Sequence, residues 1–186
     1  MNRRRIGIAF PAVAAALLSL TACGSSSAAD AEEWRPGNVA SNVKGYDQVT
    51  LAFGHDMSGG DYSGALRDPS SMLAVECAGT GDDLVVKVTG PDGATMRVKK
   101  GEMTARMSFD GVDEQDVALR GPNGYDAFRD KNPKDRDAIE WGARGFTTAH
   151  DLYGVKAPEE WARPNPKDPS RTQSGLIDFD FTATCA

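Results

Sequence analysis

Ile177-Asp178-Phe179-Asp180-Phe181-Thr182-Ala183-Thr184-Cys185, the stretch before the last residue, alternates apolar and polar side chains over its whole length. Alternation with period two places the odd-numbered side chains on one face of a β-strand and the even-numbered ones on the other. The apolar face would join a core, while the polar face would meet solvent. We therefore predict a half-buried strand over residues 176–185, in a fold made mainly of β-strands.

Stretches upstream of this strand carry the same period or are rich in β-branched residues, and they predict a set of partner strands. These strands are expected over residues 49–53, 73–77, 84–89, 94–99, 103–109 and 117–119. Gly90-Pro91-Asp92-Gly93 lies between two of them and is a strong turn signal, so we expect a hairpin there. The fold class that follows is all-β, with an antiparallel, sandwich-like domain.

The character of the chain changes over residues 121–175, which are rich in Pro, Asp, Lys, Arg and aromatic residues. A structureless loop of this length would be unusual in a compact domain. We therefore expect an ordered insertion of loops and short helices before the last strand. Short helices are expected at residues 138–143 and 148–153, and Pro158 is expected at the start of another.

Aromatic residues and a histidine in this insertion allow two interpretations. They could line a ligand pocket, or they could pack as a small satellite core, which is the commoner role of such residues. The residues concerned are Trp141, Phe146, His150, Tyr153 and Trp161.

Two cysteines lie on predicted inward faces. Cys77 shares its face with Leu73 and Val75, and Cys185 continues the apolar face of the last strand. We predict a Cys77–Cys185 disulfide if the domain is exported, because paired cysteines usually bridge in an oxidising compartment. The alternative is a pair of buried free thiols. A redox-active pair is disfavoured, because no Cys-x-x-Cys spacing is present.

The N-terminus has the features of an export signal. Arg3, Arg4 and Arg5 precede residues 6–20, which carry no charge. A membrane-spanning helix needs about 20 apolar residues, so this run is better suited to a signal peptide. It ends at Leu20-Thr21-Ala22-Cys23, which resembles the lipobox of bacterial lipoproteins.

That resemblance implies a specific processing chemistry. The thiol of Cys23 would carry diacylglycerol, and cleavage before it would remove residues 1–22 as the signal peptide. Two acyl chains suffice for stable anchoring, whereas one is marginal. We then expect residues 23–45 to form a flexible tether and residues 46–186 to form a single domain on the extracytoplasmic face of the cell membrane. Alternatively, Trp34 docks on the domain and order begins before residue 45. The alternative is an ordinary secretory signal in which Cys23 is incidental.

The domain itself also carries a family resemblance. Ala74-Val75-Glu76-Cys77, a following hairpin, and the ending Phe179-Asp180-Phe181-Thr182-Ala183-Thr184-Cys185-Ala186 resemble the LpqH-like lipoprotein antigens of mycobacteria. The resemblance implies a surface lipoprotein with no enzymatic activity to carry over. Residues 121–175 depart from the small members of that family.

Charge and motifs narrow the possible functions further. Residues 1–22 carry three of the 21 basic residues and none of the 27 acidic ones, so the chain after Cys23 processing has a net charge of −9. An acidic body argues against nucleic acid as a partner. Asp110-Gly111-Val112-Asp113-Glu114-Gln115-Asp116 lacks the spacing of an EF-hand, and we expect a solvated loop there. We predict neither a metal nor a cofactor.

Catalysis has little support in the sequence. His55-Asp56-Met57-Ser58 contains the residue types of a hydrolase triad, but consecutive residues on one turn rarely converge as a triad must. We therefore expect no enzymatic activity. The expected function is recognition of a protein, lipid or glycan by an anchored domain. The alternatives are a carrier of a small molecule or lipid with an apolar pocket and, less favoured, a hydrolase using His55 or His150.

Overall fold

The computed structural model describes residues 33–42, 45, 47–55, 68–69, 72–122, 134–149 and 153–186. These residues contain strands and single 3-10 turns but no α-helix, which confirms the all-β prediction. Residues 1–22, Cys23 and His150 lie outside the described residues.

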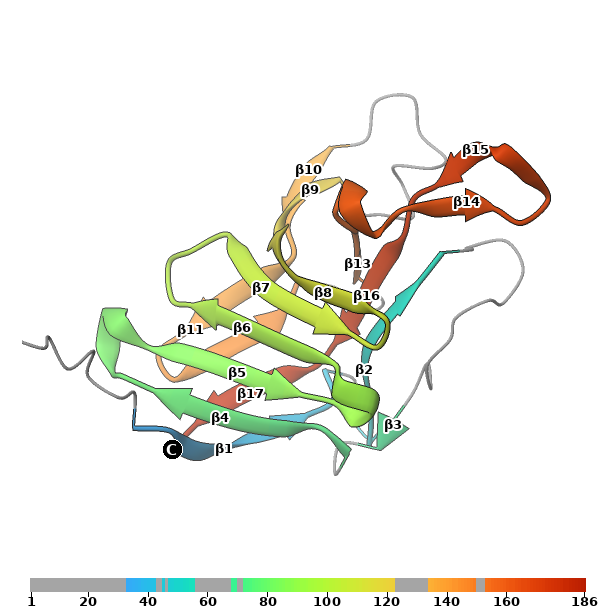
Figure 1. Cartoon of the computed structure of the whole chain (residues 1–186). Coiled ribbons are helices and arrows are strands. Elements are labelled where there is room, and N and C mark those ends of the chain that lie inside the picture. The colour runs from blue at the N-terminus through green and yellow to red at the C-terminus, as the bar shows by residue number, and fades with distance from the viewer. Residues whose placement is uncertain are drawn as a thin grey trace, which may run out of the picture. The chain divides into compact units, whose positions relative to one another are not determined.

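The larger sheet has nine strands, and all of its pairings are antiparallel. Its order is β11 (Ile139–Gly142), β12 (Gly145–Thr148), β17 (Thr182–Cys185), β1 (Arg35–Ala40), β4 (Ala74–Ala78), β5 (Val85–Thr89), β6 (Thr95–Lys99), β7 (Thr104–Phe109) and β8 (Val112–Ala118) (Figure 1). The predicted strands from residue 73 to residue 109 thus form one meander in this sheet.

A second sheet and two ribbons complete the architecture. The second sheet has the order β13 (Tyr153–Lys156), β16 (Leu176–Asp180), β2 (Gln48–Gly54) and β3 (Asp68–Pro69). One ribbon pairs β9 (Arg120–Pro122) with β10 (Asp135–Asp137), and the other pairs β14 (Arg163–Asn165) with β15 (Asp168–Gln173). The 3-10 turns span Gly81–Asp83, Pro91–Gly93 and Glu159–Trp161.

The C-terminal stretch passes from one sheet to the other. It was predicted as one strand, but β16 pairs with β2 in the second sheet, while β17 pairs with β12 and β1 in the larger one. Phe181 separates the two strands and is fully buried. Strands that change sheets in this way form the corners of β-sandwiches. The alternating pattern therefore serves both sheets, with its apolar side inward in each.

A single core lies between the inner faces of the two sheets. Burial of this apolar surface is the main driving force of folding. The largest fully buried side chains are Phe146, Phe179, Phe181, Met96, Met107, Leu119 and Ile177.

The described parts of the insertion, residues 121–122, 134–149 and 153–175, form strands and turns where short helices were expected; residues 150–152 lie outside the described residues. Residues 138–143 contain β11 and residues 148–153 overlap the ends of β12 and β13. Ile139 and Phe146 are buried while Glu140 is exposed and Thr147 half-buried, and the two strands pair across a two-residue turn. Aromatic and β-branched residues favour this extended state. At Pro158 the expected helix is only the 3-10 turn Glu159–Trp161.

The expected tether is too long, because residues 35–40 form β1. This strand pairs with β4 at its start and with β17 over the rest of its length. Its Arg35-Pro36-Gly37-Asn38-Val39-Ala40 sequence lacks a β pattern, so backbone pairing with its neighbours holds it. Gly37 is required there, because a Cβ atom would lie 2.6 Å from Val75 Cγ1 and 2.7 Å from the Thr184 carbonyl oxygen.

The acidic stretch at residues 110–116 is also not a loop throughout. Residues 112–118 form β8, which pairs with β7 at the edge of the larger sheet. The acidic side chains face solvent while Val117 is buried, so the strand presents a charged outer face. Charged residues are common on edge strands, where they discourage pairing with other chains.

Candidate functional site

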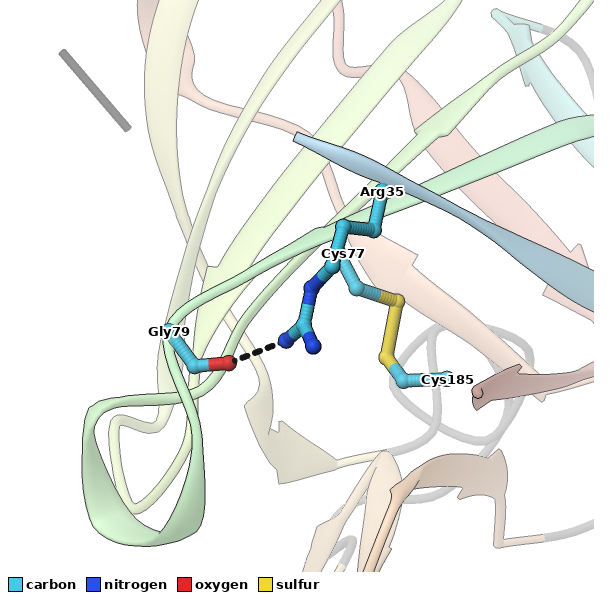
Figure 2. Close-up of a disulfide and its surroundings, with 4 residues drawn as sticks. All are labelled: Arg35, Cys77, Gly79 and Cys185. Atoms are coloured by element: carbon cyan, nitrogen blue, oxygen red, sulfur yellow. Dashed lines mark hydrogen bonds between the residues drawn. A yellow bond between two sulfur atoms is a disulfide. The ribbon is translucent and has the colours of Figure 1, made fainter. Parts of the chain in front are cut away.

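Cys77 and Cys185 form the predicted disulfide. It joins β4 to β17, with Cα atoms 5.9 Å apart. Both residues are buried, as their inward faces predicted. Figure 2 shows the bridge beside the start of β1, where the Arg35 guanidinium donates a 2.9 Å hydrogen bond to the Gly79 carbonyl oxygen. The bridge therefore fixes the two strands that flank the N-terminal strand.

The outer face of the larger sheet has a basic centre. Lys87 on β5 lies opposite Arg97 on β6, and Arg97 lies opposite Arg106 on β7. Lys99 is two residues along β6 on the same face. The outward positions of these three strands carry no acidic residue. Besides the four cations, the outward residues are Val85, Thr89, Thr95, Thr104 and Ser108. In a chain with a formal net charge of −6, this segregation of cations is a distinct surface feature, which we call the basic face.

Trp34, just before β1, lies against two cations of this face. The Lys87 Nζ atom is 5.7 Å and the Arg97 Cζ atom 5.5 Å from the centre of the indole ring. These distances are within cation–π range. The ring is half-buried, so part of it stays accessible. Trp34, immediately before β1, therefore lies on the basic face.

Acidic side chains lie at the margins of the basic face. Lys87 forms a 3.0 Å ion pair with Glu76 on β4. On the other side, Arg106 forms a 3.0 Å ion pair with Glu114 on β8 and lies 3.7 Å from Asp116. Exposed pairs of this kind contribute little to stability. The ion pairs hold the side chains of Lys87 and Arg106 in position while leaving them partly exposed to solvent.

The sequence did not single out this site. Its cations are spread over three strands and are 10 and 9 positions apart, so only their register brings them together. The turn at Gly90–Gly93 was the available signal, because it aligns Lys87 with Arg97 once the hairpin is drawn.

The aromatic residues of the insertion separate into two clusters. Trp141 and Phe146 pack with ring centres 5.4 Å apart. Trp161 instead packs on Phe53 and Phe109, at 5.1 and 5.8 Å. Phe146 and Trp161 are only 2% and 5% exposed. Phe146 and Trp161 therefore belong to the main core of the domain and not to a separate satellite core. The side chain of Tyr153 and all of His150 lie outside the described residues.

A shallow hollow of about 280 Å³ lies beside the β11–β12 turn. Gly142 and Gly145, the paired residues at the ends of the two strands, are among the residues that line it. The side chains around it come from Glu140, Ala143, Arg144, Thr147, Thr182 and Thr184. Ligand pockets for drug-sized molecules begin near this volume, so the hollow has room for a small group only.

His55 has the contacts of a structural histidine. Its Nε2 atom is 2.8 Å from the Trp161 carbonyl oxygen, and its ring packs edge-on against Phe53 at 4.7 Å. Gln173 donates a hydrogen bond to the His55 carbonyl oxygen. Asp56, Met57 and Ser58 lie outside the described residues. Within the part of the chain that the structure describes, no three His, Cys, Asp or Glu side chains gather as metal ligands would.

Asn42 is the centre of a half-buried polar network at the corner between β16 and β17. Its Oδ1 atom accepts hydrogen bonds from Thr147 and Thr182 at 2.8 and 2.6 Å. Its side-chain amide donates to Thr148 and, at 2.9 Å, to Asp180. The network joins the end of β1 to three other strands.

No protein-family model, curated protein or solved structure matches this chain. Among the residues with a described structure, no helix is long and apolar enough to span a membrane. The functional argument therefore depends on the chain's own residues.

Proposed function

We propose that this chain is a bacterial surface lipoprotein, anchored through diacylglycerol on Cys23, whose β domain recognises a partner without catalysing a reaction. The proposal combines the order of features in residues 1–23 with the domain that follows. The basic residues, the uncharged run, the small residues and the cysteine occur in the order that lipoprotein processing requires.

The disulfide is the observation that carries the proposal. A bridge between Cys77 and Cys185 is expected in an exported protein and is rare in the cytosol. It also accounts for two of the three cysteines, so that Cys23 is the one left for lipid attachment. Export and a chemical role for Cys23 thus have independent support.

Recognition is favoured over carriage for the domain itself. Of the rings that could have lined a carrier pocket, Trp141 and Phe146 pack against each other and Trp161 packs against the core. The hollow beside the β11–β12 turn is too small to enclose a lipid chain. The basic face, in contrast, presents charged side chains on a rigid sheet, as a recognition surface does.

Lipidation can be tested by mass spectrometry of the membrane fraction. We expect the wild-type chain to begin at Cys23, to carry the mass of diacylglycerol there, and to partition into membranes. Cys23→Ala should lose the lipid and fail to be processed at this position, whereas Ser25→Ala should behave as wild type. A wild-type chain without lipid on Cys23 would show that the proposed anchor is wrong.

A further inference from the structure

We propose that the basic face docks onto the anionic phospholipid headgroups of the membrane that holds the anchor. This inference rests on the proposed lipidation of Cys23. It concerns the orientation of the domain. The side of the domain that carries the basic face would lie against the membrane, and the opposite side of the domain would be presented outward. The argument depends on where the chain leaves the domain and on what that side of the domain carries.

The length of the N-terminal segment restricts the domain to the vicinity of the membrane. Cys23 and Trp34 are 11 positions apart, and a fully extended chain of that length reaches about 40 Å at most. Trp34 itself lies over Lys87 and Arg97. The anchored chain therefore joins the domain at the basic face, which favours that face as the membrane-proximal one.

The chemistry of the face suits phosphate groups. Lys and Arg side chains bind phosphate through charge-assisted hydrogen bonds, and hydroxyl groups can add further donors. Lys87, Lys99 and Arg106 keep 37%, 45% and 59% of their side-chain surface exposed. Trp34 adds an amphipathic ring of the kind that is enriched at membrane–water interfaces.

The acidic remainder of the domain makes the orientation selective. With a net charge of −9 after processing, most of its surface would be repelled by an anionic membrane. Only the centre of the basic face combines four cations with no acid on three adjacent strands. Docking would replace the ion pairs that three of these cations make with acidic residues at the margins by contacts with phosphate. These pairs are Lys87–Glu76, Lys99–Asp83 at 3.2 Å, and Arg106 with Glu114 and Asp116.

The test uses the full-length lipidated protein in vesicles and measures lysine acetylation by mass spectrometry. One vesicle type contains only zwitterionic phosphatidylcholine, and the other also contains anionic phosphatidylglycerol. Lys87 and Lys99 should be acetylated at least about fivefold more slowly in anionic vesicles, since one basic residue near such a surface contributes about that factor. Lys167, exposed in the turn of the β14–β15 ribbon, should not change. High salt should remove the protection.

A pair of variants with matched charge supplies the control. Lys87→Gln/Arg97→Gln should abolish the protection of Lys99, while Lys167→Gln/Arg171→Gln should leave it intact. Equal acetylation of Lys99 in both vesicle types, with diacylglycerol confirmed on Cys23, would overturn the docking inference but not the anchor. A chain without that lipid would overturn both.

Discussion

Asp178 is a residue whose burial conflicts with its charge. It lies on the outer side of β16, between Gly154 on β13 and Ala52 on β2. Burial and, as the smaller cause, repulsion from the nearby Asp180 carboxylate together raise the pKa of the Asp178 carboxyl to about 6. The folded state consequently holds this proton more tightly than the unfolded state, in which the pKa is about 3.8. Stability contributed by the protonated carboxyl is present at low pH and decreases as the pH rises from about 4 to above 6.

Replacing Asp178 with Asn should therefore stabilise the domain at neutral pH. The amide keeps the shape without the charge, so we expect a gain of about 1–3 kcal/mol at pH 7.5 and little change at pH 4. Thermal unfolding followed by circular dichroism at the two pH values measures this difference. Asp110→Asn, at an exposed position, is the control and should give no such pattern. An equal effect of Asp178→Asn at both pH values would contradict the burial argument.

The disulfide should contribute a large share of the free energy of unfolding. Its cysteines are 108 residues apart in sequence, and constraining a loop of about this length is worth roughly 4–5 kcal/mol in the chain-entropy model. We expect Cys77→Ala/Cys185→Ala to lower the urea midpoint sharply while the Cys23 anchor is retained. Reduced wild-type protein should unfold at nearly the same urea concentration as the variant. A variant as stable as the oxidised wild type would show that the bridge constrains little.

At the scale of elements, the corner between β16 and β17 depends on a side chain outside both strands. Asn42 connects Thr147 and Thr182 on one side with Asp180 on the other. Asn42→Ala would remove these hydrogen bonds between half-buried groups, at a cost of about 1–3 kcal/mol. Asn38→Ala, at an exposed position on β1, should cost much less. Chemical denaturation of the two variants distinguishes them, and equal destabilisation would mean that the network does not hold the corner.

The meander could be predicted from sequence, because each of its strands carries its own signal. Strands predicted at residues 84–89 and 94–99 agree with β5 and β6 within one residue at each end. Periodicity failed for β1, where Pro36 and Gly37 interrupt any pattern and partners on both sides supply the hydrogen bonds. The helix expected over residues 138–143 was wrong for a related reason, since pairing with β12 determines the extended state of β11. Long-range pairing is invisible to local patterns.

The candidate functional residues divide in the same way, into those that local sequence patterns could predict and those that depend on long-range pairing. The inward parity of two strands was enough to predict the Cys77–Cys185 bridge. The basic face could not be predicted, because it requires the register of β5, β6 and β7 and the position of Trp34. For the aromatic residues, sequence left a pocket and a core both possible. Only the packing of Trp161 on Phe53 and Phe109 placed that ring in the core.

At the scale of the whole molecule, β1 makes the start of the described chain, residues 35–40, part of the larger sheet. The strand lies between β17 and β4, so it is an interior strand of the larger sheet and not an edge strand. The compact unit accordingly runs from residue 32 to residue 186. The pull of a membrane anchor on the chain would therefore act on a central strand, beside the disulfide that joins its two neighbours.

This arrangement makes a strong prediction about where the domain begins. A chain of residues 33–186 should fold, whereas residues 46–186, the domain expected from sequence, should not form the native sheet. Loss of β1 exposes the backbone edges of β4 and β17, and domains are only about 5–15 kcal/mol stable in total. Amide chemical-shift dispersion by NMR measures the difference.

Because backbone pairing holds β1, a synthetic peptide of residues 33–42 should restore dispersion to the shorter chain by strand addition. The same peptide with Gly37→Val should fail to do so, since its side chain would meet Val75 and the Thr184 carbonyl. A well-folded 46–186 chain without peptide would show that β1 is dispensable and that the domain begins where the sequence predicted.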